Sequence, residues 1–269
     1  MASSHADWDA TFIPGTHILA NKLDITDPST LAETEYAISS IAQGEIEDGT
    51  VQIERSYDQR HLLAIHHHLF RDIYEWAGTV RTYPLWRNPV VPFADPELIP
   101  VYLDHAYQKI AQTEWEKLDH RQFSQAAATV YASVNFAHPS REGNGRAAKT
   151  FMTHLANDHG WDLDFDRVPA RAWNQAAALS APDRGTFEPV PDELFPVFER
   201  LTIIRTPAAP STQPPHPTAT ELAARGPLSA GPDAPRGPQR EASLPPRSSR
   251  TTRPPRRGHD ERKRGGPMT

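Results

Sequence analysis

The segment HPSREGNGR, residues 138–146, combines residue types that bind phosphates with one that accepts protons. His138 can accept a proton near neutral pH, so it is a candidate general base for an attacking hydroxyl group. Gly143 and Gly145 flank Asn144, and glycines let an anion approach the backbone N–H groups closely. The segment therefore predicts a site that holds an anion beside a group that activates a hydroxyl.

Three charged side chains extend this pattern. Arg146 and Lys149 are three residues apart, so on a helix they share a face and could reach the same chain of phosphates. Glu142 lies at the mouth of the site, where an acidic side chain suits Mg²⁺ better than an anion. The predicted phosphate-binding residues are Gly143, Asn144, Gly145, Arg146 and Lys149.

Two apolar helical patterns flank the segment and would position it. Residues 121–136 carry apolar side chains at helical spacing, which places His138 just beyond a buried helix. Residues 144–159 form a second stripe that ends at Gly160. The start of this second helix would present N–H groups without partners and partial positive charge, which together favour a bound phosphate.

The remaining apolar sequence predicts a mainly α fold of about 200 residues. A helix would begin at Asp27 and Pro28 and end at Gly44, and a second, beginning near residue 59, would end at Gly78. Further helices are predicted at 95–114, 169–180 and 191–204.

Residues 80–94 are the only predicted β segment. They are rich in β-branched and aromatic residues and are interrupted by prolines, which favours a short hairpin or flap.

The chain changes composition near residue 205. Residues 206–269 hold 14 of the 27 prolines and almost no large apolar side chains, so this tail is predicted to be disordered. It also holds 11 of the 28 Lys and Arg residues but only 5 of the 34 Asp and Glu residues. The basic tail could contact nucleic acid, acidic proteins or a membrane surface, but such tails are often passive solvated extensions. The acidic body, residues 1–205, argues against a general nucleic-acid binder.

Other classes of protein are disfavoured by the sequence. The chain has no cysteine, which excludes disulfide scaffolds and thiolate metal sites. The consecutive histidines 66–68 would point about 100° apart on a helix and could not converge on one ion. His154 and His159 lack the spacing and glutamate of a zinc protease. The absence of a secretory signal or an apolar span predicts a cytoplasmic protein.

The segment HPSREGNGR, followed by AAK, resembles the signature HxFx(D/E)GNGRxxR of Fic domains, and the resemblance covers about residues 11–205 with the signature at 138–149. It implies a helical Fic-type bundle that transfers AMP from ATP to a Ser, Thr or Tyr hydroxyl of a target protein, with Mg²⁺. His138 would deprotonate the hydroxyl, Glu142 would hold the metal ion and Arg146 would grip the phosphates. Gly145 stands where the Doc branch, which transfers phosphate, has lysine, and so favours AMP transfer.

The resemblance also gives the predicted flap a role. Val91, Pro92 and Phe93 would align a segment of the target protein by strand addition, which needs main-chain hydrogen bonds and little side-chain specificity.

Two positions of the signature differ from the family pattern. Ser140 stands where the family has a phenylalanine that anchors the loop, so His138 is expected to be held less firmly. Lys149 stands where the family has a second arginine that contacts the terminal phosphate, and lysine loses the two-point fork. These differences keep open an alternative in which the chain is a weakly active or inactive scaffold that binds nucleotide or protein, or one that transfers a different phosphate-containing group.

Many Fic proteins carry an inhibitory helix with the motif (S/T)xxxE(G/N). The segment STLAET, residues 29–34, matches its first part but ends in Thr34. In lacking a complete inhibitory motif, the chain resembles Fic toxins that are restrained by a separate antitoxin protein.

Overall fold

The computed structural model describes residues 2–87 and 91–205, so the predicted tail and the tip of the predicted flap lie outside the described residues. The fold is mainly α, as predicted. The α-helices are α1 (Ala2–Asp9), α2 (Pro28–Glu47), α3 (Gln59–Phe70), α4 (Ile99–Gln112), α5 (His120–Ala137), α6 (Asn144–Asp158), α7 (Ala170–Leu179) and α8 (Phe195–Leu201). Single turns of 3₁₀ helix are η1 (Pro96–Leu98), η2 (Trp115–Lys117), η3 (Phe165–Arg167) and η4 (Asp192–Leu194).

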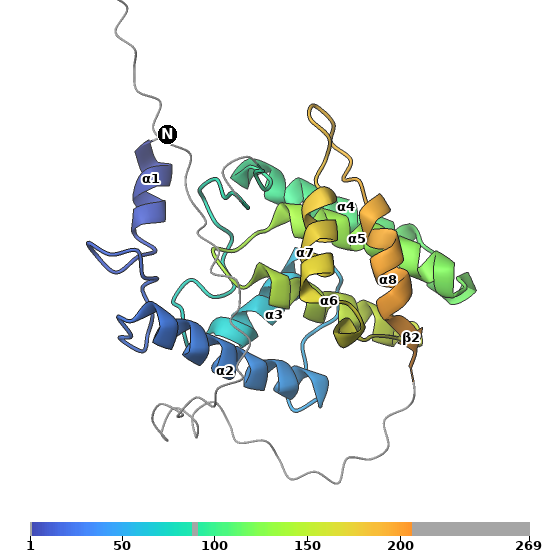
Figure 1. Cartoon of the computed structure of the whole chain (residues 1–269), viewed down its shortest axis with the longest axis horizontal. Coiled ribbons are helices and arrows are strands. Elements are labelled where there is room, and N and C mark those ends of the chain that lie inside the picture. The colour runs from blue at the N-terminus through green and yellow to red at the C-terminus, as the bar shows by residue number, and fades with distance from the viewer. Residues whose placement is uncertain (1, 88–90, 206–269) are drawn as a thin grey trace, which may run out of the picture.

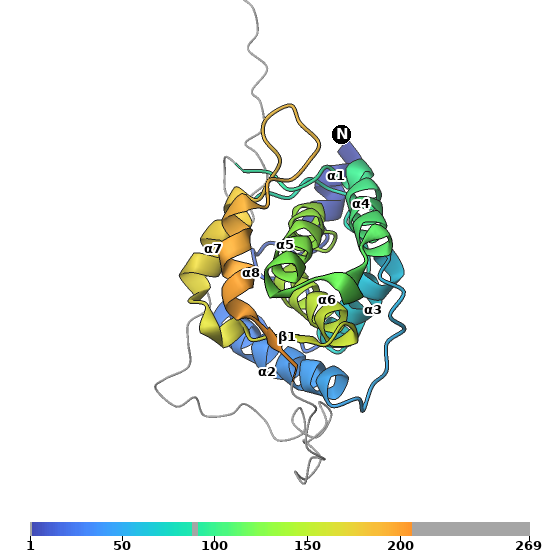
Figure 2. The ribbon, with the colours of Figure 1, turned by 90° about the vertical axis from the view of Figure 1, so that its right-hand side faces the viewer.

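Helices α5 and α6 form the centre of the fold (Figure 1). Figure 2 shows them between α3 and α4 on one side and α7 and α8 on the other, with α2 below. Helix α5 packs against α4, α6 and α8, and α6 packs against α3. The HPSREGNGR segment forms the loop that joins α5 to α6 and the first residues of α6, so the candidate site rests on the two central helices.

Side-chain caps fix the beginnings of two helices. The Asp27 carboxylate accepts a hydrogen bond of 2.8 Å from the Thr30 N–H, which confirms Asp27 as the N-cap of α2. Asp119 and Gln122 form a capping box at the start of α5, which closes two backbone groups that the helix itself cannot satisfy.

Two helix ends differ from the prediction. Helix α2 continues through Gly44 to Glu47, since a glycine in a helix costs only about 1 kcal/mol and the buried face continues to Ile46. Helix α3 ends at Phe70, well before Gly78, and a series of turns follows. Gly78 has a φ of +79°, and a Cβ there would lie 2.7 Å from His67 Cβ, so glycine serves these turns and not a helix end.

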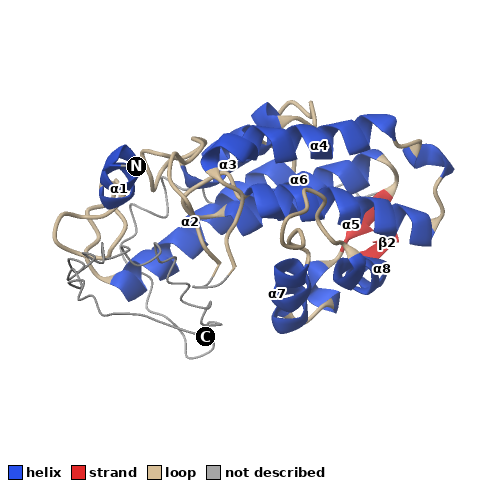
Figure 3. Cartoon of the chain, turned by 90° about the horizontal axis from the view of Figure 1, so that it is seen from above, coloured by secondary structure: helices blue, strands red, loops and turns tan. Residues whose placement is uncertain are grey.

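The prediction of a single β segment was wrong. Strands β1 (Trp161–Leu163) and β2 (Thr202–Ile204) pair antiparallel, with Asp162 opposite Ile203 (Figure 3). The predicted helix at 191–204 therefore ends at Leu201, and its last three residues form a strand. Both strands are too short for the period-two pattern by which strands are recognised in a sequence.

The predicted flap forms a hairpin in the part that the structure describes. Trp86 and Pro92 form an isolated antiparallel bridge, and the Phe93 N–H donates to the Leu85 carbonyl over 2.9 Å. Phe93 and Leu85 belong to a small apolar cluster with Tyr83 and with Trp8 of α1, apart from the main core. Helix α1 thus braces the flap.

None of the helices in the described part of the chain combines the length and apolar character needed to cross a lipid bilayer.

His61 of α3 and His154 of α6 form a buried pair between these helices. His61 Nε2 lies 2.9 Å from His154 Nδ1, and the two rings are stacked. Burial and the neighbouring histidine lower the pKa of His61 to about 3, whereas burial and Arg55 lower that of His154 to about 4. Both side chains are therefore neutral in the folded protein at neutral pH.

We expect this pair to make folding stability depend on pH. The unfolded chain protonates histidine below about pH 6.5, whereas the folded protein resists protonation down to about pH 4, so stability is complete above pH 6.5 and falls as the pH decreases. The slope is on the order of 1.4 kcal/mol per pH unit for each histidine. Urea unfolding of wild type and of the double variant His61→Gln/His154→Gln, measured from about pH 7.5 to about pH 5, tests this. An unchanged slope in the variant would assign the dependence to other groups.

Candidate active site

His138 is the C-cap of α5 and adopts the left-handed conformation, with φ 42° and ψ 61°. Few residues other than glycine adopt this region, and those that do are often functional. His138 Nδ1 lies 3.1 Å from the Asn135 carbonyl oxygen, an acceptor that requires a proton on Nδ1. The lone pair of the neutral ring is therefore on Nε2, as a general base requires.

The flap contacts this histidine directly. The Phe93 ring stacks on the His138 ring with centroids 3.5 Å apart and an interplanar angle of 9°. The Arg87 guanidinium lies over the Phe93 ring, 5.0 Å from its centroid. Of the three predicted docking residues, Phe93 is buried against the candidate base, whereas Val91 and Pro92 are more exposed.

The loop after His138 is closed by Asn144. The Ser140 N–H donates to Asn144 Oδ1 over 2.8 Å, and Asn144 Nδ2 donates to the Ser140 carbonyl over 2.8 Å. Asn144 is itself buried, so its side chain shapes the loop, and it is the backbone at this position that lies in the predicted anion-binding turn. Ser140 is fully buried, and its hydroxyl donates to the Thr79 carbonyl over 3.2 Å. Hydrogen bonds from the backbone and the hydroxyl group of Ser140 thus fix the loop.

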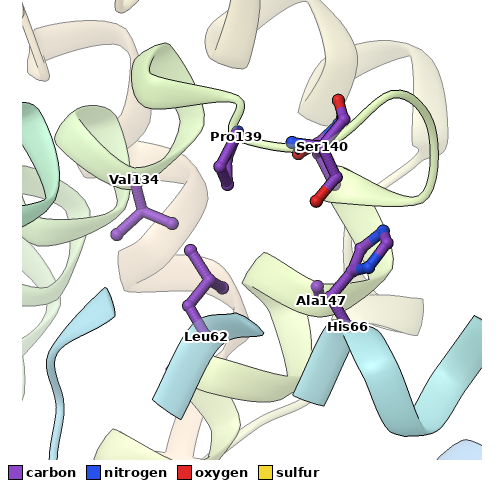
Figure 4. Close-up of a pocket in the computed structure, with 7 residues that line it drawn as sticks. Leu62, His66, Val134, Pro139, Ser140 and Ala147 are labelled. Carbon is purple, nitrogen blue, oxygen red and sulfur yellow. Dashed lines mark hydrogen bonds between the residues drawn. The ribbon is translucent and has the colours of Figure 1, made fainter. Parts of the chain in front are cut away.

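A small cavity lies beside Ser140 (Figure 4). Its free volume is about 10 Å³, the room of one water molecule. Its lining comes from α3, α5, the loop and α6: Leu62, His66, Val134, Pro139, Ser140, Asn144 and Ala147. A phenylalanine ring at position 140 does not fit this space without movement of its neighbours.

We therefore expect Ser140→Phe to lower the free energy of unfolding by about 1–3 kcal/mol through overpacking, without an increase in activity. Ser140→Ala is the matched control, because it removes the hydroxyl and adds no volume. Chemical denaturation and a transfer assay on both variants measure these effects. A more active and equally stable Ser140→Phe protein would show that the loop does lack an aromatic anchor.

Gly143 is the N-cap of α6 and has a φ of +77°. A Cβ at this position would lie 2.2 Å from a ring carbon of Phe70, which is fully buried in the core. Gly145, in the first turn of the helix, is exposed, and a Cβ there would meet nothing within 4 Å. The two glycines of the motif thus have different roles: Gly143 allows the turn, and Gly145 leaves the helix start open.

His66 of α3 links the loop between α5 and α6 to the turns that follow α3. Its Nδ1 accepts a hydrogen bond of 2.9 Å from the Gly78 N–H, so Nε2 carries the proton and donates to the Glu142 carbonyl over 2.9 Å. His67 instead contacts the Ala77 carbonyl, and His68 contacts Glu45. The three consecutive histidines therefore contact different parts of the fold.

The Glu142 carboxyl group is buried beside charged groups of both signs. Burial raises its pKa, and the nearby carboxylate of Glu35 raises it further, against the opposing effects of Arg141, the Gly143 N–H and Arg146. A bound cation would stabilise the ionised form that burial and the second carboxylate disfavour. Among the described residues no three or more His, Cys, Asp or Glu side chains form a metal cluster, so a metal ion here would need ligands from elsewhere, such as phosphate oxygens.

Arg146 is held by helix α2. Its guanidinium donates to the Glu35 carboxylate over 2.8 Å and also to the Ser39 hydroxyl. The other Glu35 oxygen accepts a hydrogen bond of 2.5 Å from the Tyr74 hydroxyl. A guanidinium has five N–H groups, so these contacts fix Arg146 at the mouth of the α6 cradle and leave donors for an anion.

Lys149 lies against two aromatic rings. Its Nζ lies 4.6 Å from the centroid of Phe165 and 5.0 Å from that of Trp173, and burial lowers its pKa. The ammonium group is thus held by aromatic faces from η3 and α7.

Because of this environment, we expect Lys149→Met to leave the ratio of ATP to ADP affinity unchanged. The loss of the two ring contacts should instead reduce stability by about 0.5–2 kcal/mol. Calorimetric titration with ATP and with ADP, together with thermal unfolding, measures both effects. A selective loss of ATP affinity would place Lys149 at the terminal phosphate.

The structure places His138, Glu142, Gly143, Gly145 and Arg146 on the loop after α5 and in the first turn of α6. Sequence reasoning did not identify the side chains that orient Arg146, which are Glu35, Ser39 and Tyr74. One signal was available, since Glu35 and Ser39 are four residues apart on the otherwise apolar buried face of α2.

The chain is similar in sequence to one protein family and to several known proteins. A model described as the Fic/DOC family matches residues 56–156, which span the described loop and both glycines. A probable protein adenylyltransferase of Sinorhizobium fredii is 31% identical over 187 residues, 67% of this chain and 92% of the relative. Protein adenylyltransferase VbhT of Bartonella schoenbuchensis is 34% identical over 168 residues, 62% of this chain. The chain spans about a third of the length of that relative, at 34%.

Solved structures show the same fold. The N-terminal Fic domain of a putative cell filamentation protein from Bartonella quintana, with bound ADP, has a TM-score of 0.65 at 25% identity, covering 73% of this chain and 95% of that chain. BepC from Bartonella tribocorum, with bound AMPPNP, has a TM-score of 0.63 at 26% identity, covering 74% and 98%. Since the Sinorhizobium relative is matched over nearly its whole length and the helical bundle is shared, the chain belongs to the Fic/DOC family.

Proposed function

We propose that the protein transfers AMP from ATP to a hydroxyl side chain of a target protein. The observation that carries this proposal is the orientation of His138, whose Nδ1 contacts the Asn135 carbonyl and so leaves the lone pair on Nε2, five residues before the Gly143 turn that opens α6. Relatives named protein adenylyltransferases and structural neighbours with ADP or AMPPNP support a nucleotide as donor.

The reaction follows from these groups. The target hydroxyl loses its proton to His138 Nε2 as its oxygen bonds to the α-phosphorus of ATP. The bond from that phosphorus to the bridging oxygen breaks, and pyrophosphate leaves. The N–H groups at the start of α6 and the Arg146 guanidinium would stabilise the charge on the phosphates.

The Glu142 carboxyl group suits Mg²⁺ as a ligand. Glu142 would supply a protein ligand and the phosphates the others, the usual arrangement for this ion at nucleotide sites. Bound there, Mg²⁺ would neutralise negative charge on the pyrophosphate leaving group.

We also propose that the flap aligns the target. A target segment would add as a strand beside Val91 and Pro92, while Phe93 keeps its place over His138.

ATP labelled separately at the α and γ phosphates tests the proposal, with purified protein, bacterial lysate and Mg²⁺ or EDTA. We expect protein labelling from the α position alone, and only with Mg²⁺. Labelling from the γ position would indicate phosphate transfer. No labelling, with nucleotide binding shown by calorimetry, would favour the scaffold alternative.

We further propose that the protein is a toxin restrained by a separate antitoxin protein. The incomplete inhibitory motif at residues 29–34 supports this proposal. Glu33, the glutamate of STLAET, is exposed, and the neighbouring Glu35 pairs with Arg146. Growth arrest on expression of the wild type, but not of a His138→Ala variant, would support a toxin.

A further inference from the structure

Arg81 is a buried arginine outside the signature, with an exposed fraction of 4%. All four of its guanidinium hydrogen bonds go to backbone carbonyls: Nε to His138 over 2.8 Å, one terminal nitrogen to Tyr83 over 2.7 Å, and the other to Ala94 over 2.6 Å and Ala137 over 3.3 Å. Its own N–H donates to the Pro139 carbonyl over 2.8 Å. A buried guanidinium group whose hydrogen bonds all go to backbone carbonyls indicates that it stabilises a particular backbone conformation.

Two of these carbonyls lie at the end of α5. Ala137 is its last residue and His138 its C-cap, where carbonyls lack helical partners and the helix carries partial negative charge. Arg81 satisfies both carbonyls at the point where the chain turns into the left-handed conformation of His138. The contact therefore supports the backbone that aims the candidate base.

The other two carbonyls belong to the flap. Tyr83 lies on its entering arm and Ala94 on its returning arm, one residue after Phe93. Phe93 in turn stacks on the His138 ring. One guanidinium thus joins both arms of the flap to the backbone of the candidate base.

We propose that Arg81 is a positioning residue that sets His138 and the flap in register with each other. This inference rests on the proposed function. Lysine could replace only part of these contacts, because its single ammonium group cannot reach carbonyls that are spread along the edges of a planar fork. The anion cradle at the start of α6 is built by other contacts, namely those of Gly143, Asn144 and Arg146.

Variants Arg81→Met and Arg81→Lys test this role. Displacement of a catalytic group by about 1 Å can cost about 10²-fold in rate, so we expect kcat to fall about 10²-fold in Arg81→Met and by an intermediate factor in Arg81→Lys. ATP affinity should change by less than about 3-fold, since the cradle keeps its contacts. Arg55→Met is the control, because Arg55 also joins distant segments, through Asp158, but lies away from the site. Unchanged kcat in Arg81→Met, or a loss of ATP affinity that parallels the loss of activity, would overturn the proposal.

Hydrogen exchange gives a readout that does not depend on activity. The N–H groups of Phe93 and Ala94 bond to Leu85 and Phe136, and that of Ser140 bonds to Asn144. In Arg81→Met we expect faster exchange at these three amides and unchanged exchange in α2 and α6. Equal acceleration throughout the fold, or none, would contradict a positioning role. If the wild type transfers no AMP, the proposed function fails while this measurement still decides the role of Arg81.

Discussion

Replacement of His138 by alanine is expected to reduce AMP transfer by about 10²–10⁴-fold, the usual contribution of a positioned general base. ATP affinity should be little changed, because the backbone of α6 and Arg146 form the phosphate site. The fold should also persist, since His138 is only partly buried and its side chain is not part of the core.

The His138 ring also supports the flap through Phe93, so two further variants separate base catalysis from packing. Phe93→Leu removes the stacked ring and keeps the base, and we expect it to weaken target binding more than turnover. His105→Ala removes a histidine of α4 that bonds to Ser133 away from the site, and should retain wild-type rates. Wild-type labelling by His138→Ala would remove this residue from the mechanism.

Gly143→Ala is expected to have the largest effect on stability. A left-handed backbone costs about 1–2 kcal/mol for a residue with a Cβ. The added methyl group would also lie 2.2 Å from a carbon of the Phe70 ring, which has no room to move in the core. Overpacking of this kind costs about 1–3 kcal/mol more, so a total loss of about 2–5 kcal/mol is expected in urea unfolding.

Gly145→Ala is the matched variant from the same motif. Its Cβ would meet nothing within 4 Å, and alanine favours a helix, so stability should stay constant or rise by about 0.5–1 kcal/mol. Nucleotide affinity should nevertheless fall, because the methyl group projects from the open start of α6. Similar losses of stability in both variants would refute the distinct roles assigned to the two glycines.

The parts of the fold that could be predicted from the sequence are those that depend on residues close together in the chain. The apolar stripes of α5 and α6 and the N-cap Asp27 of α2 are local signals. Helices α5 and α6 lie where they were predicted, and α2 begins where Asp27 predicted. The signature also predicted that His138, Glu142 and the glycines lie on one loop between two helices. Such features can be recognised in a single sequence because they involve neighbouring residues.

The parts that could not be predicted depend on contacts between distant segments. The bonds from Arg81 to His138 and from Glu35 to Arg146 join residues far apart in sequence. Strands β1 and β2 exist because they pair with each other, and neither has an internal pattern. The rings of Phe165 and Trp173, which lie beside the Lys149 ammonium group, likewise come from later elements and could not be foreseen from position 149.

The most direct test of AMP transfer is the stoichiometry of its products. Purified protein, ATP, Mg²⁺ and an identified target should yield one pyrophosphate for each AMP attached to the target, with both products lost in His138→Ala. Mass spectrometry of the intact target and an enzymatic pyrophosphate assay on the same sample provide the two numbers. Equal amounts of AMP-modified target and pyrophosphate would establish nucleotidyl transfer, whereas ADP with a phosphorylated target, or pyrophosphate without modified target, would contradict it.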